Sequence, residues 1–205
     1  LKRPEFKDEE PLTAPTQADI TGLEAEMVYI GWRVPGECDS KTSTIKGLAG
    51  EVMNNGKAGL VDLNITNKQK VLAAGAGVYG LADRDMFIMM GYPKEGQTLE
   101  EVRDILLEEA RNLREGNFSD NLLPACVANT KLSIQQSLEN NEARASMFVD
   151  NFVNGLEWKD AIDQMNDLET VTKQQIVDFA NKYLCDNNYA VVYKHQGQHT
   201  DFKKI

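Results

Sequence analysis

The sequence contains few of the residues from which metal centres and disulfide frameworks are built. It has three cysteines, an odd number, and two histidines in 205 residues. Cys38, Cys126 and Cys185 lie far apart, so none of them belongs to the Cys-x-x-Cys motif of zinc knuckles and thioredoxin-type redox sites. We therefore expect buried free thiols, and the cysteines predict neither a disulfide framework nor a metal site.

Long apolar runs and an excess of positive charge are also missing. The longest apolar runs, such as Met86–Met90, are much shorter than the roughly 20 residues that a membrane-spanning helix requires. Asp and Glu number 32 against 22 Lys and Arg, which gives a net charge of −10. Because such a negative surface repels phosphate groups, nucleic acid is not an expected partner.

The composition is that of one globular domain with a short segment at each end. Hydrophobic residues make up 41% and charged residues 26%, which is ordinary for a soluble domain of this length. Prolines and polar residues predict a linker over 1–15, a single domain over 16–194 and a tail over 195–205. The chain starts at Leu1 without a signal peptide, so we expect it to be a piece of a larger protein.

Runs of apolar and β-branched residues predict the strands. The segment 25–34, AEMVYIGWRV, is apolar on both faces and is therefore expected in or near the middle of a sheet. The segments 71–79 and 86–92 follow each other so closely that they must pair antiparallel, since a parallel connection needs about a dozen residues or more. A last strand is predicted over 189–193.

Helical periodicity and capping residues predict the remaining elements. Thr98 and Glu101 form a capping box, Ser119 is expected to cap the next helix, and Thr172 and Gln175 form a second box. The predicted helices cover approximately residues 40–54, 60–68, 98–115, 119–132, 143–153, 158–168 and 172–184. The order of elements predicts an α+β fold, a mostly antiparallel sheet with helices layered on one face.

One glycine motif suggests a nucleotide site. Gly75, Gly77 and Gly80 have the G-x-G-x-x-G spacing of a dinucleotide-binding turn. That turn must open a helix whose first amides hold the pyrophosphate, but the following residues, 81–90, are predicted to form a turn and a strand. Glycines in a twisted strand explain the pattern equally well, so a nucleotide-binding module remains the alternative hypothesis.

Candidate catalytic side chains are scarce. His195 and His199 would share one face of a helix, but they fall in the predicted tail with too few neighbouring ligands for a metal. The paired carboxylates Glu100–Glu101 and Glu108–Glu109 diverge by about 100° on a helix and are expected on solvated faces. We therefore predict no catalytic, cofactor-binding or metal-binding residue in this chain.

Several segments, in this order and spacing, carry a family resemblance. They are EAEMVYIGWRVPG (24–36), GKAGLVDLNI (56–65), GYPKEGQTLEEV (91–102), RNLREGNFSDNLL (111–123), RASMFVDNFVNG (144–155) and TVTKQQIVDFANKYL (170–184). With them, nearly the full chain resembles a lobe of the pitrilysin/insulinase family of zinc metallopeptidases. The resemblance is greatest to the second lobe of a four-lobe bacterial member.

The resemblance implies a role without catalysis. Such peptidases enclose a chamber with similar α+β lobes, and the first lobe binds zinc through His-x-x-Glu-His. This chain has no such motif, so the resemblance implies a silent lobe that packs against the zinc-bearing lobe and walls the chamber that admits peptides. The zinc would belong to the parent protein, a zinc metalloendopeptidase, and not to this chain.

The resemblance also marks two positions that lack the expected residues. Some partner lobes hold the substrate with an Arg and a Tyr, and the matching positions here are Thr66 and Ala73. No functional residue is therefore carried over. Silent relatives also serve as scaffold subunits, which leaves a non-peptidase scaffold as a further alternative. Bacterial relatives are often exported to the periplasm or cell envelope, but this sequence shows no targeting segment that supports such a location, so the compartment is left open.

Overall fold

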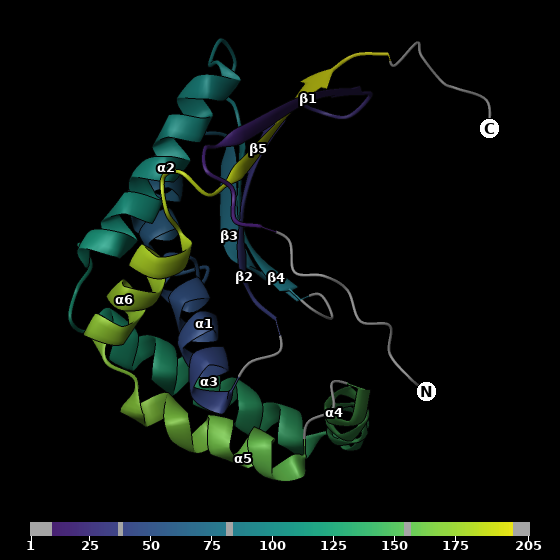
Figure 1. Cartoon of the computed structure of the whole chain (residues 1–205), viewed down its shortest axis with the longest axis vertical. Helices are drawn as coiled ribbons and strands as arrows, with labels where there is room; N and C mark the ends of the chain where they lie inside the picture. The colour runs from purple at the N-terminus through teal and green to yellow at the C-terminus, as the bar shows by residue number, and fades with distance from the viewer. Residues whose placement is uncertain (1–9, 37–38, 81–83, 154–156, 199–205) are drawn as a thin grey trace.

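The computed structural model describes residues 10–36, 39–80, 84–153 and 157–198. They form one five-stranded sheet and six α-helices, which Figure 1 shows from one side. The strands are β1 (Thr16–Gly22), β2 (Met27–Pro35), β3 (Ala73–Tyr79), β4 (Arg84–Tyr92) and β5 (Ala190–Gln196). The helices are α1 (Ser40–Met53), α2 (Leu99–Glu115), α3 (Leu122–Glu139), α4 (Asn141–Val153), α5 (Trp158–Asp167) and α6 (Lys173–Tyr183), with a π-helical turn η1 (Asp62–Thr66) and a 3₁₀ turn η2 (Leu168–Thr170).

The sheet has the order β1-β5-β2-β4-β3 and is mostly antiparallel, as predicted. β2 lies in its middle, between β5 and β4, and β3 pairs antiparallel with β4. Only β1 and β5 pair in parallel. β1 was not predicted, because all but one of its residues are exposed and its sequence shows no apolar alternation.

The last strand is longer than predicted. β5 continues to Gln196, paired with Gly22 of β1, so His195 and Gln196 lie in the sheet and not in a tail. Backbone pairing explains the extension, since β1 supplies hydrogen-bonding partners to residues that have no apolar pattern of their own. His199 lies outside the described residues.

The hydrophobic core lies between the sheet and the helices. Alternate residues of β2 point into it, and Val28, Ile30, Trp32 and Val34 are fully buried. Figure 1 shows α1, α2 and α6 along one side of the sheet, and α3, α4 and α5 beyond one of its ends. α2 contacts β2 and β4, α6 contacts β2, and α1 contacts β3. The predicted arrangement of helices on one face of the sheet is thus confirmed.

Close packing of α2 on the sheet depends on a glycine of β4. A Cβ atom built on Gly91 would lie 2.6 Å from Cγ1 of Val102, in the first turns of α2. Only a residue without a side chain lets this helix approach the strand so closely.

Most helix boundaries follow their capping residues. Thr98 accepts a hydrogen bond from the amide of Glu101, whose side chain accepts one from the amide of Thr98. The same reciprocal pair joins Thr172 and Gln175 at α6. The predicted cap of α3 is wrong, since the residue before its first turn is Asn121. Ser119 instead forms a preceding turn, accepting from the amides of Asn121 and Leu122.

Candidate functional site

One face of the sheet is not covered by any helix of the described residues. Strand alternation places Tyr29 of β2 on this face, directly beside Met90 of β4 and Val192 of β5. Tyr29 is 39% exposed and Met90 is 37% exposed. The next row of the face contains Gly31 and Ile88. We call the surface formed by these five residues the open sheet face.

Glycines on this side of the sheet are covered by methionine side chains. A Cβ atom on Gly31 would lie 2.9 Å from Cε of Met86, and one on Gly75 would lie 3.2 Å from Cε of Met90. The two thioether chains therefore lie flat over neighbouring strands. Because methionine is flexible and polarisable, such a surface can adapt to partners of different shape.

The glycine motif is part of this sheet and not a phosphate-binding turn. Gly75 and Gly77 lie within β3, and the next described element is the strand β4 instead of a helix. The outer edge of β3 is also partly occupied, since the amide of Ala76 donates to Oδ1 of Asn54 at 3.1 Å. The alternative prediction of a nucleotide site therefore lacks the helix amino terminus that it requires.

His195 forms a side-chain hydrogen bond with Asp19 on the surface. Nε2 of His195 lies 2.7 Å from Oδ1 of Asp19, across the parallel pair of β1 and β5. The hydrogen bond from His195 lowers the pKa of Asp19. Both side chains are about half exposed, so the pair contributes little to stability. Among the described residues, no group of three or more His, Cys, Asp or Glu side chains could hold a metal ion.

One predicted solvated carboxylate is buried. Glu109 is 1% exposed, and its carboxylate accepts hydrogen bonds from the side-chain amides of Asn64 and Asn112. The sequence did not predict the burial of Glu109, because a charged residue on a helix is expected to face solvent unless its hydrogen-bond partners are known. Its neighbour Glu108 lies at the surface and pairs with Arg111, as expected.

The two described cysteines are free thiols. Cys126 is buried, and burial raises the pKa of its thiol. Cys185 is only half-buried, and its Sγ lies 3.1 Å from the carbonyl oxygen of Asn181. Cys38 lies outside the described residues. Free thiols were expected, but full burial holds only for Cys126.

The positions that correspond to a substrate-binding Arg and Tyr lie on either side of a short connection. Thr66 is the last residue of η1, and Ala73 is the first residue of β3. Both side chains are exposed.

None of the helices in the described ranges is long and apolar enough to cross a membrane.

Solved structures show the same fold. A protease from Helicobacter pylori superposes with a TM-score of 0.83 at 17% identity, over 93% of this chain and 46% of that chain. An inactive peptidase domain from Bordetella parapertussis, in a protein described as a zinc protease, has a TM-score of 0.74 at 13% identity, over 84% of this chain and 93% of that chain. A peptidase M16 inactive domain from Pseudomonas fluorescens has a TM-score of 0.72 at 15% identity, over 96% of this chain and 46% of that chain.

These similarities are similarities of fold, and they extend over about half of the length of the longer proteins. This chain spans just under half of the length of the Helicobacter and Pseudomonas chains. No family model and no curated protein matches the sequence. The expectation of a peptidase-like lobe is confirmed at the level of the fold: the chain has the architecture of a single lobe of the M16-like peptidases, a group of structures that includes inactive domains.

Proposed function

We propose that this chain is a catalytically silent lobe of a zinc-dependent endopeptidase. Its open sheet face would be directed at the zinc-bearing lobe and form a wall of the chamber that holds peptides. The observation that carries the proposal is the similarity to an inactive peptidase domain of almost the same extent, of which 93% is matched. The chain itself contains no His-x-x-Glu-His motif, so the zinc would be bound elsewhere in the parent protein.

The open sheet face supports a role for this chain in contact with a partner or a peptide, with catalysis in the other lobe. Helices bury one side of the sheet, while Tyr29, Ile88 and Met90 are left at the surface of the other. Apolar groups in such an arrangement gain free energy when a partner or a peptide removes them from water. The proposed lobe would therefore contribute shape and apolar contact to the chamber, and the other lobe would contribute the chemistry.

The isolated chain is expected to have no metallopeptidase activity. We expect less than stoichiometric zinc in the tag-free 205-residue protein by elemental analysis, and no cleavage of a peptide library over the same range of zinc concentrations. One tightly held zinc ion per chain, removed by a chelator together with peptide cleavage, would contradict the proposal. A catalytic lobe bearing His-x-x-Glu-His, prepared in parallel, serves as the positive control.

Substitution on the open sheet face tests the contact with the other lobe. A His-x-x-Glu-His segment is first sought in the parent gene or its neighbours, and that lobe is coexpressed with this chain. Met90→Lys is expected to lower coelution of the two lobes and hydrolysis of peptides by the complex, because it places a charge on an apolar contact surface. Phe152→Lys is the matched control, since Phe152 is 85% exposed and lies on α4, away from the sheet.

Two results would count against this assignment. If Met90→Lys and Phe152→Lys leave coelution and hydrolysis equally unchanged, the open sheet face is not the contact surface. If neither the parent gene nor its neighbours encode His-x-x-Glu-His, the scaffold alternative is favoured over the peptidase lobe.

A further inference from the structure

The helix α4 turns its apolar side to solvent. Ala145, Phe148, Val149, Phe152 and Val153 recur at the three- and four-residue spacing that places them along one side of this helix. All five are exposed, and the exposed fractions of the last four are 54%, 59%, 85% and 56%. We call these five residues the outer stripe of α4. A helix at the surface of a domain ordinarily directs such a stripe at the core.

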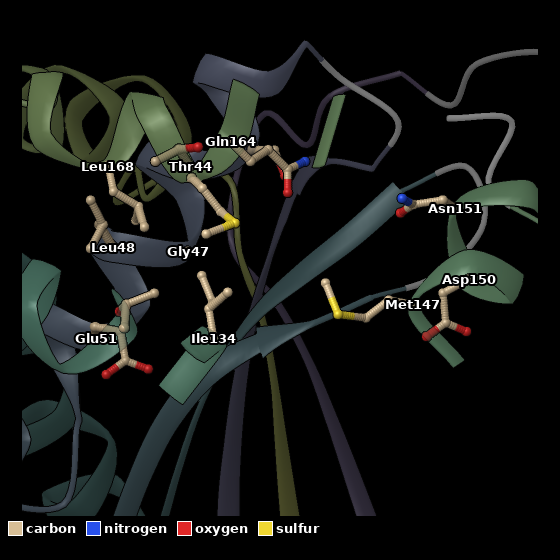
Figure 2. Close-up of a pocket in the computed structure, with 13 residues that line it drawn as sticks. Thr44, Gly47, Leu48, Glu51, Ile134, Met147, Asp150, Asn151, Gln164 and Leu168 are labelled. Atoms are coloured by element: carbon tan, nitrogen blue, oxygen red, sulfur yellow. The ribbon is translucent and has the colours of Figure 1, made fainter. Parts of the chain in front are cut away.

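The side of α4 that faces the domain is its less apolar side. Met147, Asp150 and Asn151 border a cavity of about 420 Å³ between α4 and the helices α1, α3 and α5. Figure 2 shows Met147 and Asn151 across this cavity from Leu48 of α1. None of the residues of α4 is buried. The packing of α4 on the domain therefore leaves the outer stripe uncovered.

An aromatic pair joins the outer stripe to the next helix. The ring of Trp158 in α5 stacks on that of Phe148, with 4.4 Å between the centroids and 28° between the planes. Trp158 is still 37% exposed, and Ile162, one turn further along α5, is 40% exposed. Aromatic side chains that are already positioned in the free protein lose little conformational freedom on binding and commonly dominate the affinity of an interface.

The charge of this region indicates the kind of partner. Residues 139–167 contain seven Asp and Glu against two Lys and Arg, so this segment carries a charge of −5, half of that of the whole chain. One of the two basic residues, Lys159, pairs with Asp163. Glu142 is exposed on the same side of α4 as the outer stripe, three positions before Ala145. Such a surface attracts a basic partner and repels a second copy of this chain.

We propose that the outer stripe of α4 binds a basic amphipathic helix of a partner protein. The apolar face of that helix would pack over Phe148, Val149 and Phe152, and its lysines and arginines would lie near Glu142. The partner is a helix because the outer stripe is straight and extends along a helix of 13 residues, a shape that a second helix matches by side-by-side packing. The apolar side chains supply the contact, and the charge determines which helices are accepted.

This contact is independent of the proposed peptidase role. α4 lies beyond one end of the sheet (Figure 1), apart from the open sheet face that is assigned to the zinc-bearing lobe. A failure of one assignment therefore leaves the other standing.

Calorimetric titration of the full 205-residue chain with designed peptides tests the proposal. We expect Ac-KLLKKLLKKLLKKL-NH₂, whose leucines lie on one side of a helix, to bind saturably. Two matched peptides should bind at least about tenfold more weakly. One has glutamate in place of every lysine, and the other has lysine and leucine in strict alternation, which gives no one-sided helical stripe. Equal affinity of either matched peptide would contradict the proposal.

Variants of the outer stripe locate the binding. Phe152→Ser and Val149→Ser are each expected to weaken binding of the basic peptide about tenfold, the typical effect of truncating a central side chain of an interface. Both side chains are more than half exposed, so the fold should be retained, which urea unfolding verifies. Leu72→Ser is the matched control, because Leu72 is 72% exposed and lies just before β3. Unchanged binding by both α4 variants, or an equal loss with Leu72→Ser, would overturn the proposal.

Sedimentation velocity of the chain without peptide distinguishes a partner helix from a second copy. We expect the wild type and Phe152→Ser to sediment alike, because the outer stripe is free in the absence of its partner. A dimer of the wild type that Phe152→Ser dissociates would show that a second copy covers the outer stripe, against the proposal of a basic helix.

Discussion

Replacement of Lys46 by methionine is expected to lower the free energy of unfolding by about 3–5 kcal/mol, the typical cost of removing one partner of a buried ion pair. The side chain of Lys46 is 7% exposed and pairs with Asp85, whose side chain is 12% exposed. Nζ of Lys46 also donates to the carbonyl oxygens of Pro35 and Gly36, at 2.8 and 3.3 Å. The substitution therefore takes the ammonium partner from a buried carboxylate and leaves two carbonyl groups without their donor.

Urea unfolding followed by circular dichroism measures this effect. Lys159→Met is the matched control, because Lys159 pairs with Asp163 on the surface of α5 with 74% of its side chain exposed. Such exposed pairs contribute little to stability, because water and salt screen them. The double variant Lys46→Met with Asp85→Leu should recover part of the loss, since it removes the buried charge too. Equal losses for Lys46→Met and Lys159→Met would show that the Lys46–Asp85 pair does not stabilise the fold.

Trp32→Ala is expected to destabilise the chain by about 3–5 kcal/mol, as large-to-small changes of aromatic core residues do. Trp32 of β2 is 1% exposed, and its Nε1 donates to the carbonyl oxygen of Cys185 at 3.1 Å. Its ring lies 5.6 Å, centroid to centroid, from that of Tyr189. Removal of the indole opens a cavity in the core and breaks the link between the central strand and the segment that leads into β5.

The only other tryptophan provides the control. Trp158 stacks on Phe148 at a centroid distance of 4.4 Å but is 37% exposed. Trp158→Ala is therefore expected to cost about 1 kcal/mol, the typical value of an aromatic pair beyond its buried area. Circular dichroism is the appropriate probe, because each variant removes a fluorophore. Similar midpoints and slopes for both variants in urea would contradict the central role assigned to Trp32.

Elements with strong local patterns could be predicted from the sequence. The strand around Trp32 has alternate apolar residues, Val28 to Val34, that lie in the core, and helices α2 and α6 begin at capping boxes whose hydrogen bonds join residues three positions apart. Local chemistry decides these features, so a single sequence contains them. The α+β class followed from the order of these elements, and the peptidase-like lobe was expected from the family resemblance of several segments.

Features that depend on distant partners could not be predicted. β1 is exposed along almost its whole length and is recognisable only by its backbone pairing with β5. The local sequence of β1 does not indicate this pairing. The burial of Glu109 likewise depends on Asn64, 45 positions away in the chain. The spacing of apolar residues along the chain does not indicate which carboxylate will accept a hydrogen bond from a side-chain amide after folding.

The amino-acid sequence by itself determined the strands and helices with a clear apolar period, the helix caps and the absence of a His-x-x-Glu-His motif, because these depend on residues a few positions apart. Only the tertiary structure decided that one side of the sheet stays uncovered, that Gly31 of β2 and Gly75 of β3 lie under methionine side chains, and that Glu109 is buried against Asn64. These last features join segments that approach each other only when the core forms, and their geometry follows from packing and not from local pattern.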